Sequence, residues 1–132
     1  MAQITFNPGI MTNDADLFMA LRASSTYGGI TIIAATATEG ATVGGAGTSH
    51  QFALVNMGTS GTVVGGTIAT TTASTAAWTA DVPKAFTLVA AQVFVDSGEY
   101  VYLRKIQQGA DSDNDVQTAI NIEWCEGVVL VG

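Results

Sequence analysis

The stretch from Val116 to Trp124 alternates between apolar or β-branched side chains and polar ones. One side carries Val116, Thr118, Ile120, Ile122 and Trp124, and the other side carries Gln117, Asn121 and Glu123. Successive side chains of a β-strand point to opposite faces of the sheet. The alternation therefore predicts a strand with one face buried and one face in water.

Further stretches show the same alternation less regularly and are rich in Thr, Val, Ile and aromatic residues, which strands prefer. They are residues 2–6, 29–35, 51–57, 62–69, 77–80, 86–95, 100–106 and 128–131. Gly-rich or Asp-rich turn signals lie between them, for example at residues 44–47, 65–66 and 96–98. Many short strands joined by such turns predict an all-β sandwich or barrel.

The N-terminal part of the chain departs from this pattern. In residues 12–22, polar capping residues and acids precede Leu17, Phe18 and Leu21, and Arg22 follows. This spacing slightly favours one or two turns of helix, with a strand as the alternative. We expect residues 1–25 to form an N-terminal arm and residues 26–132 to form the β-sandwich domain. Residues 67–79, rich in Thr and Ala, are expected to be a loop with a weak edge strand.

A hairpin is predicted where residues 96–99, with the sequence Asp-Ser-Gly-Glu, separate two apolar strands. Gly98 can adopt the positive φ that such a turn requires. In the strand that follows, Val101, Leu103 and Lys105 share one face, and Tyr100, Tyr102, Arg104 and Ile106 share the other. We expect Val101 and Leu103 to enter the core and Lys105 to carry its charge back to water near the strand end.

Tyr100, Tyr102 and Arg104 are thus the candidate interface residues. Tyr and Arg are over-represented at the energetic centres of protein interfaces. Two alternatives remain open from the sequence: plain core tyrosines with their hydroxyls at the rim, and a platform on which sugars stack.

Composition narrows the range of partners. The chain has 132 residues, the size of one domain, and its charged residues make up 11% of the total against about 25% in an average protein. Uncharged Thr, Gly, Ala and Ser must therefore cover much of the surface, which suits burial against other subunits. The net charge of −7, with only Arg22, Lys84, Arg104 and Lys105 as basic residues, excludes DNA and RNA as partners.

Cys125 is the only cysteine, so an internal disulfide is excluded and a free thiol is expected. The N-terminal sequence has neither the basic start nor the apolar run of a secretory signal. The longest apolar runs, such as residues 85–95, are much shorter than the ~20 residues that a membrane span needs. We therefore expect a protein that is made in a cytoplasm and has no membrane partner.

Motifs for catalysis or cofactor binding are not found. His50, the only histidine, lies at the entry to a strand after a glycine loop, which does not suggest a catalytic triad. Residues 58–61 are one residue short of a G-x-S-x-G elbow and predict a turn. Residues 44–47 lack the lysine of a phosphate-binding loop. We expect no enzymatic activity and no cofactor.

Asp111, Asp113 and Asp115 alternate in a polar run, and oxygen ligands at such a spacing can wrap a calcium ion. A calcium-binding EF-hand loop would have Gly and Glu where this chain has Val116 and Ile122. A solvated turn between two strands is the preferred interpretation, and a cation site remains the alternative.

The order of the predicted strands and the kind of residues in them together resemble a known family. The segments TYGGITIIAATAT, HQFALVNMG, GGTIA, FTLVAAQVFVDSGEYVYLRK and INIEWCEGVVLV, which cover roughly residues 28–131, resemble the small β-sandwich proteins of tailed bacteriophages. The resemblance is strongest to capsid cement or decoration proteins with a jelly-roll core. No single motif carries it.

This resemblance implies a jelly-roll β-sandwich that forms a homotrimer on the outer capsid surface of the virion and clamps neighbouring subunits of the major capsid protein. Sandwich domains of similar texture occur in phage tail fibres and spikes. A receptor-binding sandwich that contacts host surface glycans is therefore the alternative function.

Overall fold

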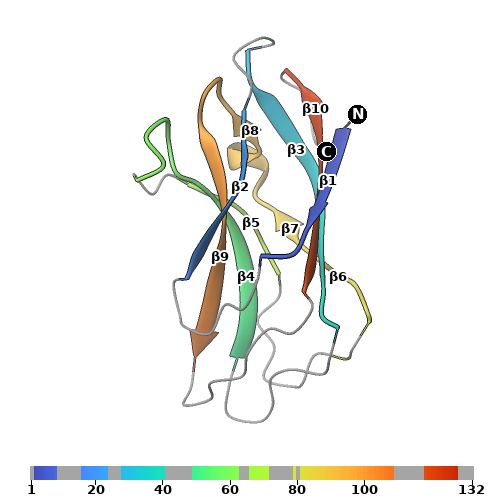
Figure 1. The fold of residues 1–132 in the computed structure, drawn as a ribbon. Helices are drawn as coiled ribbons and strands as arrows, with labels where there is room; N and C mark the ends of the chain where they lie inside the picture. Colours follow the sequence, from blue (N-terminus) through green and yellow to red (C-terminus); the bar gives the residue numbers. More distant parts are fainter. Residues whose placement is uncertain are drawn as a thin grey trace.

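The computed structural model describes residues 2–8, 16–23, 28–40, 49–62, 66–71, 79, 81–108 and 118–127. They form two antiparallel β-sheets packed face to face (Figure 1). Within these residues the helical content is a single 3-10 turn, Ala90–Gln92. None of them belongs to a helix with the length and apolar character needed to cross a membrane.

In the described part of the chain each sheet has five strands. Sheet A contains β1 (Ala2–Phe6), β10 (Ala119–Glu126), β3 (Ile30–Thr38) and β6 (Lys84–Ala85) in this order, and β8 (Phe94–Val95) also pairs with β3. Sheet B contains β2 (Leu17–Arg22), β9 (Tyr100–Gln108), β4 (Ser49–Asn56), β5 (Thr67–Thr70) and β7 (Thr87–Leu88) in this order.

One set of strand pairings is nested along the chain, and β10 with β3, β9 with β4 and β5 with β7 complete the two sheets. β1 pairs with β10, β2 with β9, β3 with β6 and β8, and β4 with β5, all antiparallel. A chain paired in this way is one long hairpin rolled into two layers, which is the arrangement of a jelly roll. The expected jelly-roll-like antiparallel β-sandwich is thus confirmed.

Apolar side chains from both sheets fill the space between the layers. Fully buried members include Ile32, Phe52, Leu54, Ile68, Val95, Val101, Leu103, Ile120 and Ile122. Removing one such side chain from water contributes about 1.5–3 kcal/mol. The core therefore holds the two sheets together, and the prediction that Val101 and Leu103 enter it is confirmed.

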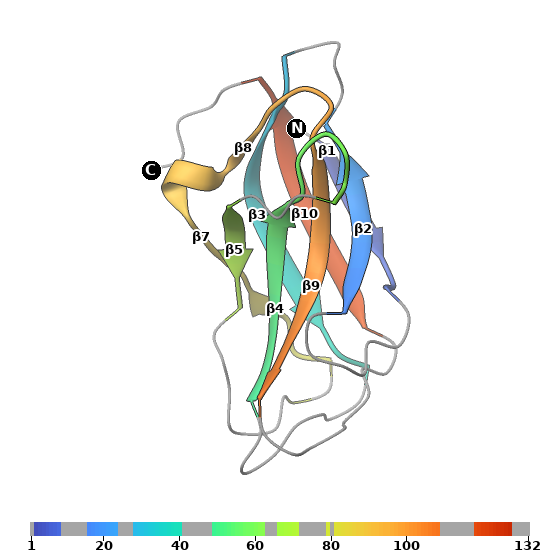
Figure 2. The same ribbon diagram turned by 90° about the vertical axis from the view of Figure 1, so that its left-hand side faces the viewer.

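The apolar run at residues 86–95 does not form the single strand expected for it. Residues 84–95 pass from sheet A to sheet B and back as β6, β7, the 3-10 turn and β8. A continuous apolar run fits either sheet, so its periodicity could not show that it serves both. This lacing segment lies at the side of the sandwich opposite β1 and β2 (Figures 1 and 2).

Backbone hydrogen bonds hold the lacing segment to both layers. The amide of Phe86 donates to the carbonyl of Ala35 at 2.9 Å, and the amide of Val89 donates to the carbonyl of Ile68 at 2.8 Å. Ala35 belongs to sheet A, whereas Ile68 belongs to sheet B. The segment thus ties the two sheets together at this edge.

The helix favoured for residues 12–22 is wrong where the structure describes it. Residues 17–22 form β2, which pairs with β9 along its length. Leu, Met, Ala and Arg are good helix formers, but the free energy of pairing with a neighbouring strand overrides this local preference. The expected strand at residues 2–6 is confirmed as β1.

The division into an arm of residues 1–25 and a domain of residues 26–132 stays a prediction. In this structure β1 and β2, which lie in the range of that arm, pair within the sandwich. β5 coincides with the end of the strand expected at residues 62–69, of which residues 63–65 lie outside the described part of the chain, and it lies between β4 and β7 rather than at the edge expected for residues 67–79. Thr79 is not in a strand, and residues 128–131 lie outside the described residues.

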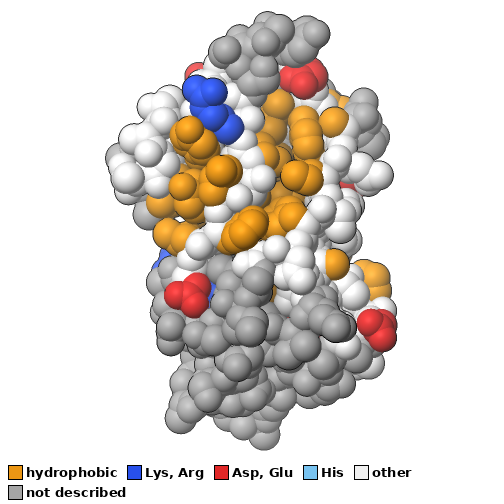
Figure 3. All heavy atoms as spheres, viewed as in Figure 1, with side chains coloured by type: hydrophobic (Ala, Val, Ile, Leu, Met, Phe, Trp, Pro, Cys, Tyr) orange, Lys and Arg blue, Asp and Glu red, His pale blue; other side chains and the backbone are white. Residues whose placement is uncertain are grey.

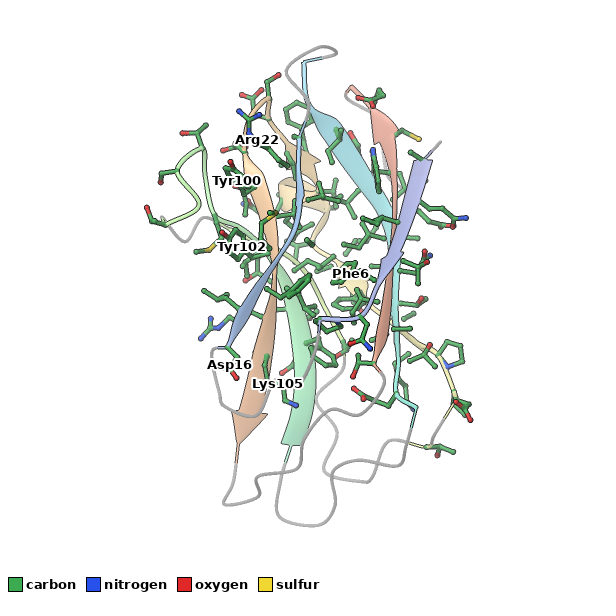
Figure 4. The ribbon with its side chains drawn as sticks, in the orientation of Figure 1. Phe6, Asp16, Arg22, Tyr100, Tyr102 and Lys105 are labelled. Atoms are coloured by element: carbon green, nitrogen blue, oxygen red, sulfur yellow. The ribbon has the colours of Figure 1, made fainter. Side chains whose placement is uncertain are left out.

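Lys105 is fully buried, so the expectation that its charge reaches water is wrong. β9 continues to Gln108, and Lys105 is therefore not at the strand end. Its amide donates to the carbonyl of Asp16 at 2.9 Å, and both residues are labelled at the lower end of Figure 4. Its Nζ atom lies 5.5 Å from the centroid of the Phe52 ring, within range of a cation–π contact.

Candidate protein-binding face

The outward side of sheet B presents the predicted interface residues. Opposite residues of paired strands share a face, and the register places Leu17 opposite Arg104, Met19 opposite Tyr102 and Arg22 opposite Tyr100. We call this set, Leu17, Met19, Arg22, Tyr100, Tyr102 and Arg104, the outer β2–β9 face. Figure 2 looks onto this side of the sheet.

The turn at residues 96–99 fixes the start of β9 and has the form expected from the sequence. Gly98 has a φ of 79°. The Glu99 carboxylate accepts hydrogen bonds from the Asp96 amide at 2.8 Å and from the Asn56 side-chain amide at 3.0 Å. The turn is therefore anchored to the end of β4, and this anchoring sets where Tyr100 and the alternating residues after it emerge.

A small apolar cluster lies beneath the two tyrosines. Ala53, Val55 and Met57 are buried although they lie on the outward side of β4, and Tyr100, Tyr102 and Ile106 pack against them. Sheet B thus has apolar packing on both of its faces. The tyrosines point away from the main core but are half-buried. They are therefore neither plain core residues nor fully exposed interface residues.

The loop of residues 58–62 folds against the tyrosines. The Tyr100 amide donates to the carbonyl of Gly58 at 3.0 Å, and the Met57 amide donates to the carbonyl of Tyr100 at 2.9 Å. A Cβ atom at Gly61 would lie 3.1 Å from the Tyr102 hydroxyl oxygen. Gly61, at a φ of 71°, therefore lets the backbone approach the ring closely.

Arg22 covers part of the face. Its guanidinium carbon lies 5.6 Å from the centroid of the Tyr100 ring, a cation–π contact. The Tyr100 and Tyr102 rings meet edge to face with centroids 6.5 Å apart. Figure 4 shows Arg22, Tyr100 and Tyr102 one below the other in the upper half of this side.

Leu17 and Met19 belong to the face although they were not predicted as interface residues. They are 46% and 49% exposed, the highest values among the large apolar side chains in the described residues. The sequence could have shown this, because the outward Leu17 and Met19 alternate with the inward Phe18 and Ala20, as in a strand. The helical interpretation of this stretch concealed it.

The outward side of sheet A has a different character. Gln3 and Thr5 on β1 lie opposite Glu123 and Asn121 on β10. The Thr5 hydroxyl donates to the side-chain oxygen of Asn121 at 2.9 Å. The outward side of β1 and β10 is therefore polar at these positions, whereas the outer β2–β9 face carries exposed apolar and aromatic side chains.

Of the remaining candidate sites, residues 58–61 and Cys125 lie within the described residues. Residues 58–61 form the expected turn, in which the Ser60 and Thr62 hydroxyls share a hydrogen bond of 2.8 Å. No group of three or more His, Cys, Asp or Glu side chains in the described ranges could hold a metal ion. Cys125 is a half-buried free thiol.

Two predictions fall outside the described residues. They are the glycine loop at residues 44–47 and the candidate cation site at Asp111, Asp113 and Asp115. The side chain of His50 is likewise outside them.

Comparison of the chain with protein-family models, with curated proteins and with solved structures gave no match. The role of the outer β2–β9 face is therefore inferred from its own side chains.

Proposed function

We propose that this protein is a structural virion protein of a tailed bacteriophage, a trimeric cement protein that binds the outer surface of the capsid and stabilises the shell. It acts without catalysis and without a cofactor. Its partners are further copies of the chain and the major capsid protein, and it is made in the host cytoplasm before it joins the virion.

One observation carries the proposal: Tyr100, Tyr102 and Arg104 point away from the main core, beside the exposed Leu17 and Met19. A face that combines Tyr, Arg and exposed apolar side chains has the composition of an interface centre. The outward positions of β1 and β10 on sheet A are polar by contrast, and we expect them to face water.

Multiple copies supply the strength of binding. A trimer that contacts several capsid subunits at once gains avidity from each contact, even when each one is weak. Because it binds the assembled shell and not its free subunits, the trimer stabilises the shell by mass action.

The glycan-binding alternative has less support. Sugars stack on the exposed faces of aromatic rings, but Arg22 lies over the Tyr100 ring, and the loop of residues 58–62 packs against Tyr102. These contacts leave little free ring surface for a sugar.

The test compares capsids that lack the protein before and after it is added. We expect the added protein to raise the melting temperature of the capsids. Arg104→Glu should abolish most of this gain, because it reverses a charge on the outer β2–β9 face. Glu123→Lys, a matched charge reversal at a half-buried strand position on sheet A, should leave the gain intact.

An unchanged capsid melting temperature with the wild-type protein would refute the cement role. Saturable adsorption of the protein to host cells, with competition by free polysaccharide, would support the receptor-binding alternative instead. A stable monomer at micromolar concentration, measured by light scattering after size exclusion, would refute the trimer.

A further inference from the structure

β2 has a free edge. It is the last strand of sheet B, and among the described residues it pairs only with β9. β1 is likewise the last strand of sheet A and lies on the same side of the sandwich (Figure 1). The opposite side is crossed by the lacing segment of residues 84–95, and the described residues there form no comparably long free strand.

Apolar side chains surround this free edge. Leu17 and Met19 on β2 are exposed, and Phe18 and Ala20 are only partly buried. Figure 3 shows hydrophobic side chains over β2 and over the strip between β2 and β1, with charged groups only around the rim of this area. An apolar edge of this kind favours association with another protein.

β2 has little of the protection that isolated edge strands usually carry. Such strands are blunted by Lys, Pro, inward-pointing charges or a bulge. β2 contains neither Lys nor Pro, and its protective features are the exposed charge of Arg22 at its end and an irregularity in register between Met19 and Leu21. The bulge shortens the stretch that can pair regularly, so most of the binding free energy must come from the apolar side chains.

The charges at the two ends of the strand select the partner. Asp16 directly precedes β2, and Arg22 ends it. When two copies of β2 lie antiparallel, Asp16 of each copy comes near Arg22 of the other. A parallel arrangement would instead bring like charges together. Asp16 is half-buried and Arg22 is exposed. Surface pairs contribute only about 0–1 kcal/mol, so these pairs would fix orientation more than affinity.

We propose that β2 pairs antiparallel with β2 of a second copy of this chain, about a two-fold axis near Met19, which lies midway between Asp16 and Arg22. The contact is isologous, because the same strand serves both partners. It continues sheet B from one copy into the next. The apolar strip between β2 and β1 is buried at the same time.

This contact is separate from the proposed trimer. A two-fold contact alone gives a dimer, a three-fold contact alone gives a trimer, and the two together give a hexamer. The mass of the particle in solution therefore distinguishes failure of one proposal from failure of the other.

The first experiment measures this mass by light scattering for the wild type, for Met19→Lys and for the control Val89→Lys. Val89 is similarly exposed, at 41%, but lies within the lacing segment, on the side of the sandwich opposite β2. We expect a dimer or a hexamer for the wild type, half that mass for Met19→Lys, and the wild-type mass for Val89→Lys. A wild-type monomer or trimer, or a mass unaffected by Met19→Lys, would overturn the β2 contact.

The second experiment does not depend on how well the lysine variant folds. Met19→Cys is combined with Cys125→Ser, which removes the native thiol, and the purified protein is oxidised. We expect a covalent dimer on a non-reducing gel, because two Met19 positions meet near the two-fold axis. The control Val89→Cys with Cys125→Ser should stay monomeric on the gel, and equal crosslinking of both variants would refute the proposed pairing.

Discussion

The rings of Phe6 and Phe18 stack with their centroids 5.3 Å apart and their planes 10° from parallel. Phe6 comes from β1 of sheet A and Phe18 from β2 of sheet B. The stack therefore connects the two layers on the side where both sheets end in a free strand.

We predict that this stack couples the two sheets energetically. Phe6→Ala and Phe18→Ala should each lower the free energy of unfolding by about 2–4 kcal/mol, because both side chains are partly buried. The double variant should lose about 0.5–1.5 kcal/mol less than the sum of the single losses, since the stack can be removed only once. Urea unfolding of the four proteins measures this coupling.

Phe6 and Tyr102 provide the control cycle for this coupling. Phe6 points from sheet A into the core, whereas Tyr102 lies on the outward side of sheet B. The losses in the free energy of unfolding caused by the two substitutions should therefore add. Additive losses for Phe6 and Phe18 as well would show that the stack contributes nothing of its own.

Gly61 and Gly28 separate two reasons for requiring glycine. Both have a positive φ, 71° and 74°, but a Cβ atom at Gly61 would meet Tyr102, whereas one at Gly28 would have no atom within 4 Å. We predict that Gly28→Ala lowers the free energy of unfolding by about 1–2 kcal/mol, the cost of a left-handed backbone. Gly61→Ala should cost more, because it also crowds the Tyr102 hydroxyl.

Tyr102→Phe removes the hydroxyl that the new methyl group would meet. In this background the extra cost of Gly61→Ala should therefore shrink toward the value for Gly28→Ala. Thermal unfolding of the four Gly61 and Tyr102 combinations measures the effect. An equal cost of Gly61→Ala in both backgrounds would mean that the loop does not press on Tyr102.

Lys105 and Arg104 are neighbours on β9 with opposite environments. Lys105 is fully buried and lies over Phe52, whereas Arg104 is half-exposed on the outward side. We predict that Lys105→Ala lowers the free energy of unfolding by about 2–4 kcal/mol, through lost packing and a lost buried polar contact. Arg104→Ala should cost less than about 1 kcal/mol. The reverse ranking in urea unfolding would contradict the placement of β9 in the structure.

The Glu39 carboxylate is buried and accepts a hydrogen bond of 2.7 Å from the Thr118 hydroxyl. We predict that Thr118→Val lowers the free energy of unfolding by about 1–3 kcal/mol, because the buried carboxylate loses this hydrogen bond. Thr5→Val is the matched control, since it removes the exposed hydrogen bond to Asn121 and should change stability by less than about 0.5 kcal/mol. Equal losses in thermal unfolding would show that burial does not strengthen the bond to Glu39.

Local patterns were sufficient to predict much of the sandwich. Alternation in residues 116–124 predicted β10 because one face of that strand is buried and the other is wet. Gly98 marked the turn before β9. Val101 and Leu103 are two positions apart and share one face of the strand, and this spacing correctly placed both in the core. In each case the signal lies within a few residues of the feature it predicts.

The errors arose where distant residues decide the structure. Leu17–Arg22 became a strand because β9 was available to pair with it, although its residues favour a helix. Lys105 was expected to reach water because nothing nearby in the sequence shows that β9 continues to Gln108. The outward cluster of Ala53, Val55 and Met57 was missed because β4 is apolar on both faces, and its residues therefore do not show which way they point.

The nested pairing of strands has a consequence for synthesis. β1 leaves the ribosome early, but its partner β10 does not exist until residue 126 has been translated. Until then β1 lacks the strand with which it pairs in the folded protein. Sheet A is therefore completed last. If translation stopped before β10, neither β1 nor β3 could pair with that strand.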